Sequence, residues 1–313
     1  MRVLVTGAGG YLGSWLAPRL QELGHDVVGY SRSTHPELGL AGWHTGDIGD
    51  ADALVAATRG CEVVVHLAVQ PQYRSELDPV SDLKTNTLGT LQTLRAAKAA
   101  GVRRFLLAST SAVYGAAAGC LSEESPLAPV TPYGVSKGAA EAYCGLFSRA
   151  LGLHTTILRI FQVYGHSRDG HLRLTVEGHF LRAVLDGHPP TIYGSPANAF
   201  DFVHVDDVLQ AFELTLAAEL PPGLTLNVGS GKLTSLGQLA GWCLEAAGMV
   251  TAPASTEAPL LAAAPAAGAA SSGEARPPQY ADLVRIHHAL GYVPTSDLRA
   301  WVFDVIRPLT TDH

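Results

Sequence analysis

The sequence predicts an α/β fold: a doubly wound parallel sheet that carries a smaller C-terminal α/β cap. In the first half of the chain, short apolar and β-branched runs alternate with longer helical patterns. Continuous apolar strands that alternate with helices form parallel sheets covered on both faces. After about residue 165 the alternation ends, and helical stretches separated by Pro and Gly turns follow. We therefore expect a main domain over residues 1–165, to which segments near 200–220 return, and a cap with the C-terminal helix over 166–313.

The expected elements follow one another along the chain. The opening strand Arg2–Thr6 leads into a helix over Tyr11–Leu23, whose apolar residues, Leu23 included, recur on one face and which stops at Gly24. Further strands are expected at Asp26–Tyr30, Val63–Leu67, Phe105–Ser109 and Thr155–Phe161, and helices at Leu83–Ala100 and Pro132–Leu151. Later helices are expected at Glu177–Asp186, Val208–Ala218, Leu236–Ala247 and Leu298–Ile306, with a polar loop at His166–Arg173 and a mobile loop over 251–273, which is nearly all Ala, Pro, Ser and Thr.

Composition restricts the classes of function. A chain of 313 residues that is 47% hydrophobic can bury a large core. A net charge of −7 without a basic stripe argues against a nucleic-acid partner or an acidic membrane surface, and we expect no membrane helix. The four cysteines are scattered without metal-ligand spacing. Because the first expected strand begins at Arg2, we expect no signal peptide. These features indicate a cytoplasmic protein with reduced thiols.

A glycine-rich turn joins the first strand to the first helix. Residues 7–13 read GAGGYLG. Gly7 permits the tight turn, Gly10 lets the backbone approach a pyrophosphate, and Gly13 allows the helix to pack closely on the strand. The helix that begins at Tyr11 and Leu12 offers free N–H groups to phosphates. The main domain is therefore predicted to be a dinucleotide-binding (Rossmann) domain.

The end of the second strand bears on the choice between NAD and NADP. An NAD site usually has a carboxylate here for the ribose 2′-OH, whereas this chain has Ser31 and Arg32. The Arg32 guanidinium would suit a 2′-phosphate by charge and by forked hydrogen bonding, which favours NADP over NAD; the other reading is a solvated surface arginine. Asp47 and Ile48, after the third strand, are expected to border the adenine, although Asp47 could also be an ordinary helix cap.

Tyr133 and Lys137 are spaced to lie on one face of a helix. A phenol with a pKa near 10 is a poor base at neutral pH. A nearby ammonium and the positive nicotinamide of an oxidised cofactor both favour the phenolate, so we expect a lowered pKa for Tyr133. Lys137 can also bond the nicotinamide ribose. The strand Phe105–Ser109 runs into further hydroxyl residues, one of which can orient a substrate oxygen beside the phenol.

In these motifs the chain resembles the extended short-chain dehydrogenases/reductases, specifically the sugar-nucleotide epimerase/dehydratase group. The matching segments are TGAGGYLG, Asp47-Ile48, His66-Leu67-Ala68, Asn86 before Gly89-Thr90, STSAVYG, PYGVSK, Leu158–Phe161 and Asp201–Asp207. The resemblance implies that Thr110 is the hydroxyl of the catalytic triad, Tyr133 the proton-transfer group and Lys137 its partner. It also implies a cofactor site lined by Leu67, Ala68, Val69, Asn86, Ile160 and Val163, with His66 as a packing residue.

The chain departs from the family pattern on the substrate side. The 4,6-dehydratases follow their hydroxyl with an Asp-Glu pair, whereas Ser111 and an alanine stand here, so we do not expect that dehydration. Gln162 replaces an Asn, and Phe200 replaces an Arg, that bind the nucleotide diphosphate in the family. Losing one charge-assisted hydrogen bond forfeits roughly 1.5–3 kcal/mol. The candidates to compensate are Arg168, Arg173 and Arg276. The expected substrate-binding residues are Ser111, Gln162, Arg168, Phe200 and Arg276.

A cluster of metal-ligand residue types occurs in the polar loop, at His166, Asp169 and His171. A fourth ligand is not evident, so we expect no metal there.

The leading hypothesis is an NAD(P)-dependent enzyme that moves a hydride at a sugar carbon of a nucleotide sugar. The layout favours a C4 epimerase, and Arg32 favours a 4-keto reductase. A second hypothesis is an NADPH-dependent ketoreductase of a less polar carbonyl compound, enclosed by Phe200 and residues 251–273. A third, of another class, is a non-catalytic NADP-sensing protein, against which the presence of both Tyr133 and Lys137 counts. The resemblance also implies a homodimer, paired through the helices at Leu83–Ala100 and Pro132–Leu151.

Overall fold

The computed structural model describes residues 1–173, 175–256 and 277–310. Its main sheet has seven strands in the order β11-β7-β5-β4-β1-β2-β3, and every pairing is parallel. The strands are β1 (Arg2–Thr6), β2 (Asp26–Ser31), β3 (Gly42–Thr45), β4 (Val63–His66), β5 (Arg104–Thr110), β7 (His154–Ile160) and β11 (Leu224–Val228). Because the chain winds outward from β1 in both directions, the sheet is doubly wound, as predicted. The edge strand β11 was not expected.

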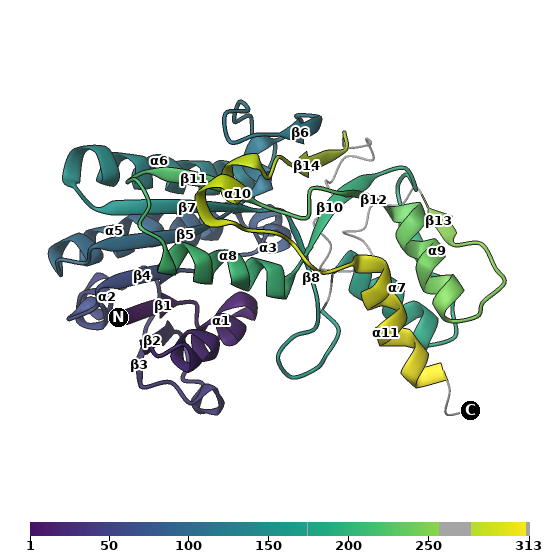
Figure 1. Ribbon diagram of the computed structural model, residues 1–313, viewed down its shortest axis with the longest axis horizontal. Helices are drawn as coiled ribbons and strands as arrows, with labels where there is room; N and C mark the ends of the chain where they lie inside the picture. Colours follow the sequence, from purple (N-terminus) through teal and green to yellow (C-terminus); the bar gives the residue numbers. More distant parts are fainter. Residues whose placement is uncertain (174, 257–276, 311–313) are drawn as a thin grey trace.

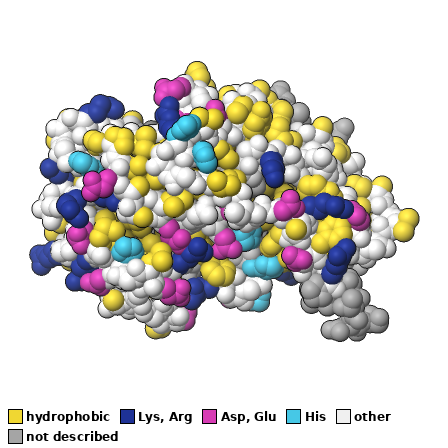
Figure 2. Space-filling model, viewed as in Figure 1, with side chains coloured by type: hydrophobic (Ala, Val, Ile, Leu, Met, Phe, Trp, Pro, Cys, Tyr) yellow, Lys and Arg dark blue, Asp and Glu magenta, His cyan; other side chains and the backbone are white. Residues whose placement is uncertain are grey.

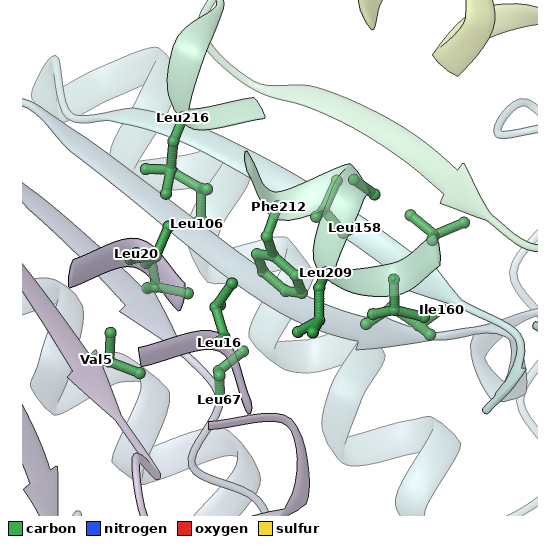
Figure 3. Close-up of a cluster of buried hydrophobic side chains, with 14 of the residues drawn as sticks. Val5, Leu16, Leu20, Leu67, Leu106, Leu158, Ile160, Leu209, Phe212 and Leu216 are labelled. Atoms are coloured by element: carbon green, nitrogen blue, oxygen red, sulfur yellow. The ribbon is translucent and has the colours of Figure 1, made fainter. Parts of the chain in front are cut away.

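Helices cover both faces of this sheet (Figure 1). One face carries α1 (Tyr11–Glu22) and α8 (Val205–Ala217), and the other carries α2 (Ala51–Thr58), α5 (Gly89–Ala99) and α6 (Pro132–Leu151). Figure 3 shows Leu16 and Leu20 of α1 and Phe212 of α8 packed over the strands. The expectation that Leu23 shares this apolar face was wrong: the helix ends at Glu22, and the Leu23 side chain is 58% exposed.

The boundaries of α6 match the prediction because they are encoded locally. Thr131 is the N-cap and its side chain accepts from the Gly134 N–H, Pro132 occupies the first turn, and Gly152 ends the helix with a φ of 68°. The predicted helix over Leu83–Ala100 is correct only in part. A π-helical segment, η2 (Leu83–Leu88), leads into α5. Such π-turns are rare and are frequent at functional sites.

Three short helical elements lie in the connections of the main sheet. η1 (Pro36–Leu38) lies between β2 and β3, and α3 (Gln72–Leu77) and α4 (Pro79–Asp82) lie between β4 and η2. A further 3-10 turn, η3 (Ser111–Tyr114), directly follows β5.

The remaining elements build the part of the molecule at the right of Figure 1 and its junction with the main sheet. A second sheet has the order β12-β10-β14-β6, with β8 paired to β10, and β13 pairs with β9. Its strands are β6 (Gly119–Leu121), β8 (Gln162–Tyr164), β10 (Ala199–His204), β12 (Leu233–Ser235) and β14 (Gln279–Ala281); the pair is β9 (Thr191–Tyr193) and β13 (Ala254–Thr256). Helices α7 (Val176–Leu185), α9 (Leu236–Ala246) and α11 (Leu298–Thr310) pack together, whereas α10 (Val284–Leu290) packs beside β11.

Two predictions for this part need correction. The helix expected from Val208 begins at Val205, because His204 is its N-cap. Residues 254–256 fall within the predicted loop, yet they form β13 by pairing with β9. Residues 257–276, which include the rest of that loop and Arg276, lie outside the described residues.

On the surface, basic and acidic side chains are interspersed on the face that Figure 2 shows. Across the described ranges, the helices are too short or too polar to cross a bilayer.

Candidate active site

The glycine turn between β1 and α1 lies at the carboxyl edge of the main sheet. A Cβ on Gly7, whose φ is +70°, would stand 2.7 Å from the Ala68 nitrogen, and one on Gly13 would stand 2.2 Å from the Gly7 carbonyl oxygen. Only glycines therefore let the turn pack this closely on the end of β4 and on α1. The N-cap of α1 is Gly10, which supplies no side-chain capping bond. The first N–H groups of α1 are thus left to a phosphate, and the turn fits a dinucleotide.

Other predicted cofactor residues surround this turn. Leu67 and Ile160 are buried, whereas Val69 is 43% exposed, and Val163 packs partly buried on the main core. Asn86 is fully buried: its Oδ1 accepts from the Gln70 N–H at 2.8 Å, and its Nδ2 donates to the Gln70 carbonyl at 3.0 Å. Asn86 therefore holds the loop after β4 in place.

The loop after β2 lies over the same turn. Arg32 is exposed, and the Ser31 hydroxyl donates to the Ser33 carbonyl at 2.6 Å. The imidazole of His35 stands so close to Gly9 that a Cβ there would be 2.2 Å from His35 Nε2. Sequence reasoning missed His35, because its position depends on how the loop folds back.

The structure shows a local role for Asp47, which was expected to border the adenine of the cofactor. Asp47 Oδ1 accepts from the Gly49 N–H at 2.9 Å, so this carboxylate stabilises its own turn. The N-cap of α2 is Asp50, not Asp47. Ile48 is buried against Gly89 at the start of α5.

The three predicted catalytic residues come together where β5 ends and α6 begins. The Thr110 side chain is close enough to the Tyr133 hydroxyl to influence its pKa. Lys137 is only 2% exposed, and its Nζ donates to the Ala108 carbonyl at 2.6 Å. The parallel sheet thus brings a strand-end hydroxyl to a phenol one helical turn before an ammonium.

The electrostatics of this trio differ from the prediction. Burial, followed by the negative charge of Asp82, raises the pKa of Tyr133 to about 12, against a lowering effect of the Thr110 hydrogen bond. Lys137 is not among the groups that act on the Tyr133 phenol here, because its ammonium is directed to the Ala108 carbonyl. The lowering expected with an oxidised nicotinamide bound beside the phenol stays a prediction. Burial also lowers the pKa of Lys137 to about 8, which the neighbouring Glu141 opposes.

A pocket opens beside Thr110, between the end of β5, β10 and the chain before β14. Its lining residues are Gln72, Thr110, Ser111, Ala112, Gly115, Val130, Thr131, Phe161, Gln162, Ala199, Phe200, Asp201, Pro277 and Gln279. Three of the five predicted substrate residues, Ser111, Gln162 and Phe200, are thus brought together. None of the described lining residues is Lys or Arg. The carboxylate of Asp201 accepts from the backbone of Ser230, Gly231 and Ala281, so it serves the fold.

The predicted arginines lie elsewhere. Arg168 donates to the Ser14 carbonyl at 3.4 Å and stacks on Trp15 of α1, so the structure places it outside this pocket. Arg173 stacks on the Tyr11 ring, with 3.5 Å between its Cζ and the ring centroid.

The site combines a dinucleotide-binding turn, a Tyr–Lys pair on one helix and a hydroxyl at the end of the neighbouring strand. This combination defines an enzyme of the extended short-chain dehydrogenase/reductase type. The chain matches the NAD dependent epimerase/dehydratase family over residues 3–229, and it belongs to that family.

Relatives agree with this assignment. The chain is 33% identical to the UDP-glucose 4-epimerase of Mycolicibacterium smegmatis over 94% of both chains. It is 31% identical to the dTDP-glucose 4,6-dehydratase of Streptomyces griseus, over 79% of this chain and 78% of the relative.

Two solved structures are similar over nearly their whole length. MoeE5 in complex with UDP-glucuronic acid and NAD has a TM-score of 0.85 and 32% identity over 99% of each chain. The UDP-glucose 4-epimerase of Thermotoga maritima with UDP-glucose has a TM-score of 0.85 and 28% identity over 100% of each chain.

Proposed function

We propose that the protein is an NAD-dependent 4-epimerase of a UDP-sugar. The observation that carries the proposal is that the Tyr133 hydroxyl interacts with the side chain of Thr110, which lines the pocket. It would place one proton donor and one hydroxyl where a sugar O4 could bond both. UDP-sugars and NAD are the ligands named for MoeE5, and the Mycolicibacterium relative is named as a 4-epimerase.

In this proposal, the residues of the site have the following roles. A bound nicotinamide would supply the hydride chemistry at the sugar C4. Tyr133 takes the proton from O4 when the carbon is oxidised and gives it back when the carbon is reduced. Thr110 holds the same oxygen by a hydrogen bond. The Lys137 ammonium favours the phenolate form once it is turned toward the phenol. General acid–base catalysis of this kind is typically worth about 10²–10⁴-fold.

Dehydration is disfavoured by two lining residues. Ser111 and Ala112 stand in the pocket where the resemblance places the Asp-Glu pair of the 4,6-dehydratases. An alkyl group cannot exchange a proton, and a serine hydroxyl is a weak acid and a weak base at neutral pH. We therefore do not extend the likeness to the Streptomyces dehydratase to the elimination step.

The cofactor can be identified directly. The family and the solved neighbours favour NAD, whereas Arg32 predicts NADP. The two differ by the adenosine 2′-phosphate, so mass spectrometry of the nucleotide released from purified protein separates them. Arg32→Ala should weaken the binding of NADP and leave that of NAD nearly unchanged.

The cation-poor pocket wall favours a second candidate, an NADPH-dependent ketoreductase of a less polar carbonyl compound. Val130, Phe161 and Phe200 contribute apolar surface to the described lining. A diphosphate would need cations from outside it.

One experiment separates these functions. The purified protein, with no cofactor added, is incubated with UDP-glucose, UDP-glucuronic acid or UDP-N-acetylglucosamine, and the anomeric proton signals are followed by NMR. The appearance of the C4 epimer under these conditions supports the epimerase, and the other two outcomes are measured in parallel samples to which NADPH is added. NADPH consumption with a 4-keto sugar indicates the reductase, and turnover restricted to apolar ketones indicates the second candidate.

We also propose that two copies pair through α5, α6 and the segment before α5. Large apolar side chains are exposed there, namely Leu83, Leu88, Val135, Leu146 and Leu151 at 43–55%. Sedimentation analysis should give a dimer, and Leu146→Glu should weaken it.

The division into a dinucleotide-binding domain over 1–165, with returning segments, and a substrate-binding cap over 166–313 stays part of the proposal. A cytoplasmic location is also part of the proposal, and the free thiols of Cys61, Cys144 and Cys243 favour it.

A further inference from the structure

The end of β2 lacks the carboxylate that an NAD site usually places there. The family and the solved neighbours favour NAD, yet β2 ends in Ser31 and is followed by Arg32, neither of which is acidic. In most NAD sites that carboxylate accepts a hydrogen bond from the adenosine ribose 2′-OH. An acceptor for this hydroxyl would therefore have to come from another part of the loop after β2.

The imidazole of His35, four residues after the end of β2, lies on the glycine turn that fits the dinucleotide. A Cβ built on Gly9 would stand 2.2 Å from His35 Nε2 and 2.4 Å from its Cδ2. The φ of Gly9 is not positive, so the backbone itself does not require glycine there. What Gly9 provides is the absence of a side chain, which lets the ring reach the turn.

The neighbours of His35 hold its ring in this place. Its Nδ1 lies 2.9 Å from Glu37 Oε1, and its Nε2 lies 3.2 Å from the Ser33 hydroxyl. The ring also packs against Trp43 of β3, with 5.5 Å between the two ring centroids. The His35 side chain is only 29% exposed, so the loop keeps the imidazole against the turn rather than in solvent.

The contact with Glu37 decides which nitrogen of His35 carries the proton. An ionised carboxylate can only accept hydrogen bonds, so Nδ1 is the donor in this contact. In the neutral imidazole Nε2 is then the acceptor, and it is the ring atom nearest to the position of a Gly9 Cβ.

An acceptor in this position distinguishes a hydroxyl from a phosphate. It can receive the hydrogen of a ribose 2′-OH, as the carboxylate does in other NAD sites. The Ser33 side chain that now contacts Nε2 is exposed and can turn to water instead. A 2′-phosphate brings only further acceptor oxygens and negative charge, and it gains no hydrogen bond from Nε2.

Resting on the proposed function, we propose that His35 is a specificity-determining residue of the cofactor site. It accepts from the adenosine ribose 2′-OH in place of the absent carboxylate. Glu37 fixes the proton on Nδ1, and Gly9 leaves room for the ring. Together these residues select the ribose 2′-hydroxyl of NAD over the 2′-phosphate of NADP. The exposed Arg32 acts against this selection only from the solvent side, where its charge is screened.

The test is His35→Ala, and the readout is the nucleotide that the protein retains. Purified protein is dialysed at pH 8 against equal concentrations of NAD and NADP and freed of unbound nucleotide by gel filtration. Mass spectrometry of the nucleotides released on denaturation gives the ratio of bound NAD to bound NADP, which equals the ratio of the two affinities. We expect this ratio to fall about two- to tenfold in His35→Ala, because NAD loses one neutral hydrogen bond and NADP loses none.

Two further variants locate the effect on the glycine turn. Gly9→Ala keeps His35 and Glu37 but drives the ring off the turn, so it should lower the ratio as His35→Ala does. In the double variant Gly9→Ala/His35→Ala the new methyl group meets no imidazole, and the ratio should equal that of His35→Ala alone. The matched control is His154→Ala, which removes an exposed histidine at the start of β7, on the opposite edge of the sheet, and should leave the ratio unchanged.

The direction of the change decides the inference. An unchanged ratio in His35→Ala would mean that the imidazole only packs on the turn, and a higher ratio would make it a cation for the 2′-phosphate. Either result overturns the proposal. If a variant retains too little nucleotide to measure, the two dissociation constants are obtained by calorimetry and compared in the same way.

None of these measurements needs a sugar substrate. The ratio in the unaltered protein tests dependence on NAD, and the change in ratio between variant and unaltered protein tests the role of His35. If no UDP-sugar is epimerised, the proposed function fails while the change in ratio still stands. Failure of the proposed function and failure of the inference are therefore distinguishable.

Discussion

Glu141 and Arg159 form a forked ion pair between α6 and the main sheet. Arg159 Nη2 lies 2.7 Å and Nε 3.2 Å from Glu141 Oε2, and the two side chains are only 7% and 5% exposed. Glu141 lies one turn after Lys137 on α6, and Arg159 lies on β7. The pair fixes α6 to the sheet and places a negative charge beside the buried ammonium.

Glu141→Gln should therefore destabilise the protein strongly. Removing one partner of a buried pair leaves the other charge uncompensated, which typically costs about 3–5 kcal/mol. The free energy of unfolding in urea measures the loss. The control is Glu62→Gln, which breaks a surface ion pair with Arg103. In that pair the Arg103 side chain is 69% exposed and the Glu62 side chain 42% exposed, so its loss should cost less than about 1 kcal/mol. Equal costs for the two variants would contradict the role given to the buried pair.

Tyr133→Phe should abolish the proton transfer and leave the fold intact. The substitution removes the hydroxyl that lies beside Thr110 and little else. We expect kcat for UDP-sugar epimerisation to fall about 10²–10⁴-fold, with the bound cofactor retained. Tyr143→Phe, on the same helix and also partly buried, should keep its activity within a few-fold. Normal turnover by Tyr133→Phe would exclude the assignment.

His66 should make the protein sensitive to acid. Burial, reinforced by Lys137, lowers its pKa to about 3, so the folded protein keeps this imidazole neutral. In the unfolded chain it titrates near 6.5. Between pH 6.5 and 3 the unfolded state binds more protons, and stability falls as the pH falls through this window. The loss between pH 6.5 and 5 should be about 2 kcal/mol.

Urea unfolding at the two pH values measures this loss. It should shrink in His66→Gln, which keeps a polar partner for the threonines, and persist in His288→Gln, which replaces an exposed histidine. An unchanged pH dependence in His66→Gln would assign the acid sensitivity to other groups.

Gly13→Ala should disrupt the cofactor site. Its Cβ would approach the Gly7 carbonyl oxygen to 2.2 Å, and both the turn and α1 would have to move. We expect loss of the co-purified dinucleotide and a lower melting temperature. Gly241→Ala in α9, where a Cβ meets nothing within 4 Å, should be neutral or stabilise by up to about 1 kcal/mol. A Gly13→Ala protein that retains its cofactor would show that the turn tolerates displacement.

Much of the site could be predicted because its signals are local. The glycine turn, the Tyr133 and Lys137 spacing and the boundaries of α6 each depend on a few neighbouring residues. The structure brings Thr110 to Tyr133 as expected, since a parallel sheet gathers its strand ends at one edge.

Other features depend on residues far apart in the chain. Strand β11 reaches the main sheet only by pairing with β7, and β13 exists only because β9 lies beside it. Neither Asp82 nor His35 was singled out from the sequence. Nothing in their immediate neighbours indicates what they face.

The sequence by itself determined the fold class, the dinucleotide turn and the Tyr133–Lys137 pair that we propose for proton transfer, because turn geometry and helical spacing are properties of adjacent residues. Only the tertiary structure decided the charge state of those residues. The pKa of Tyr133 depends on burial and on the charge of Asp82, which packing brings near it from another helix. A sequence pattern specifies neither the solvent exposure of Tyr133 nor its distance from Asp82.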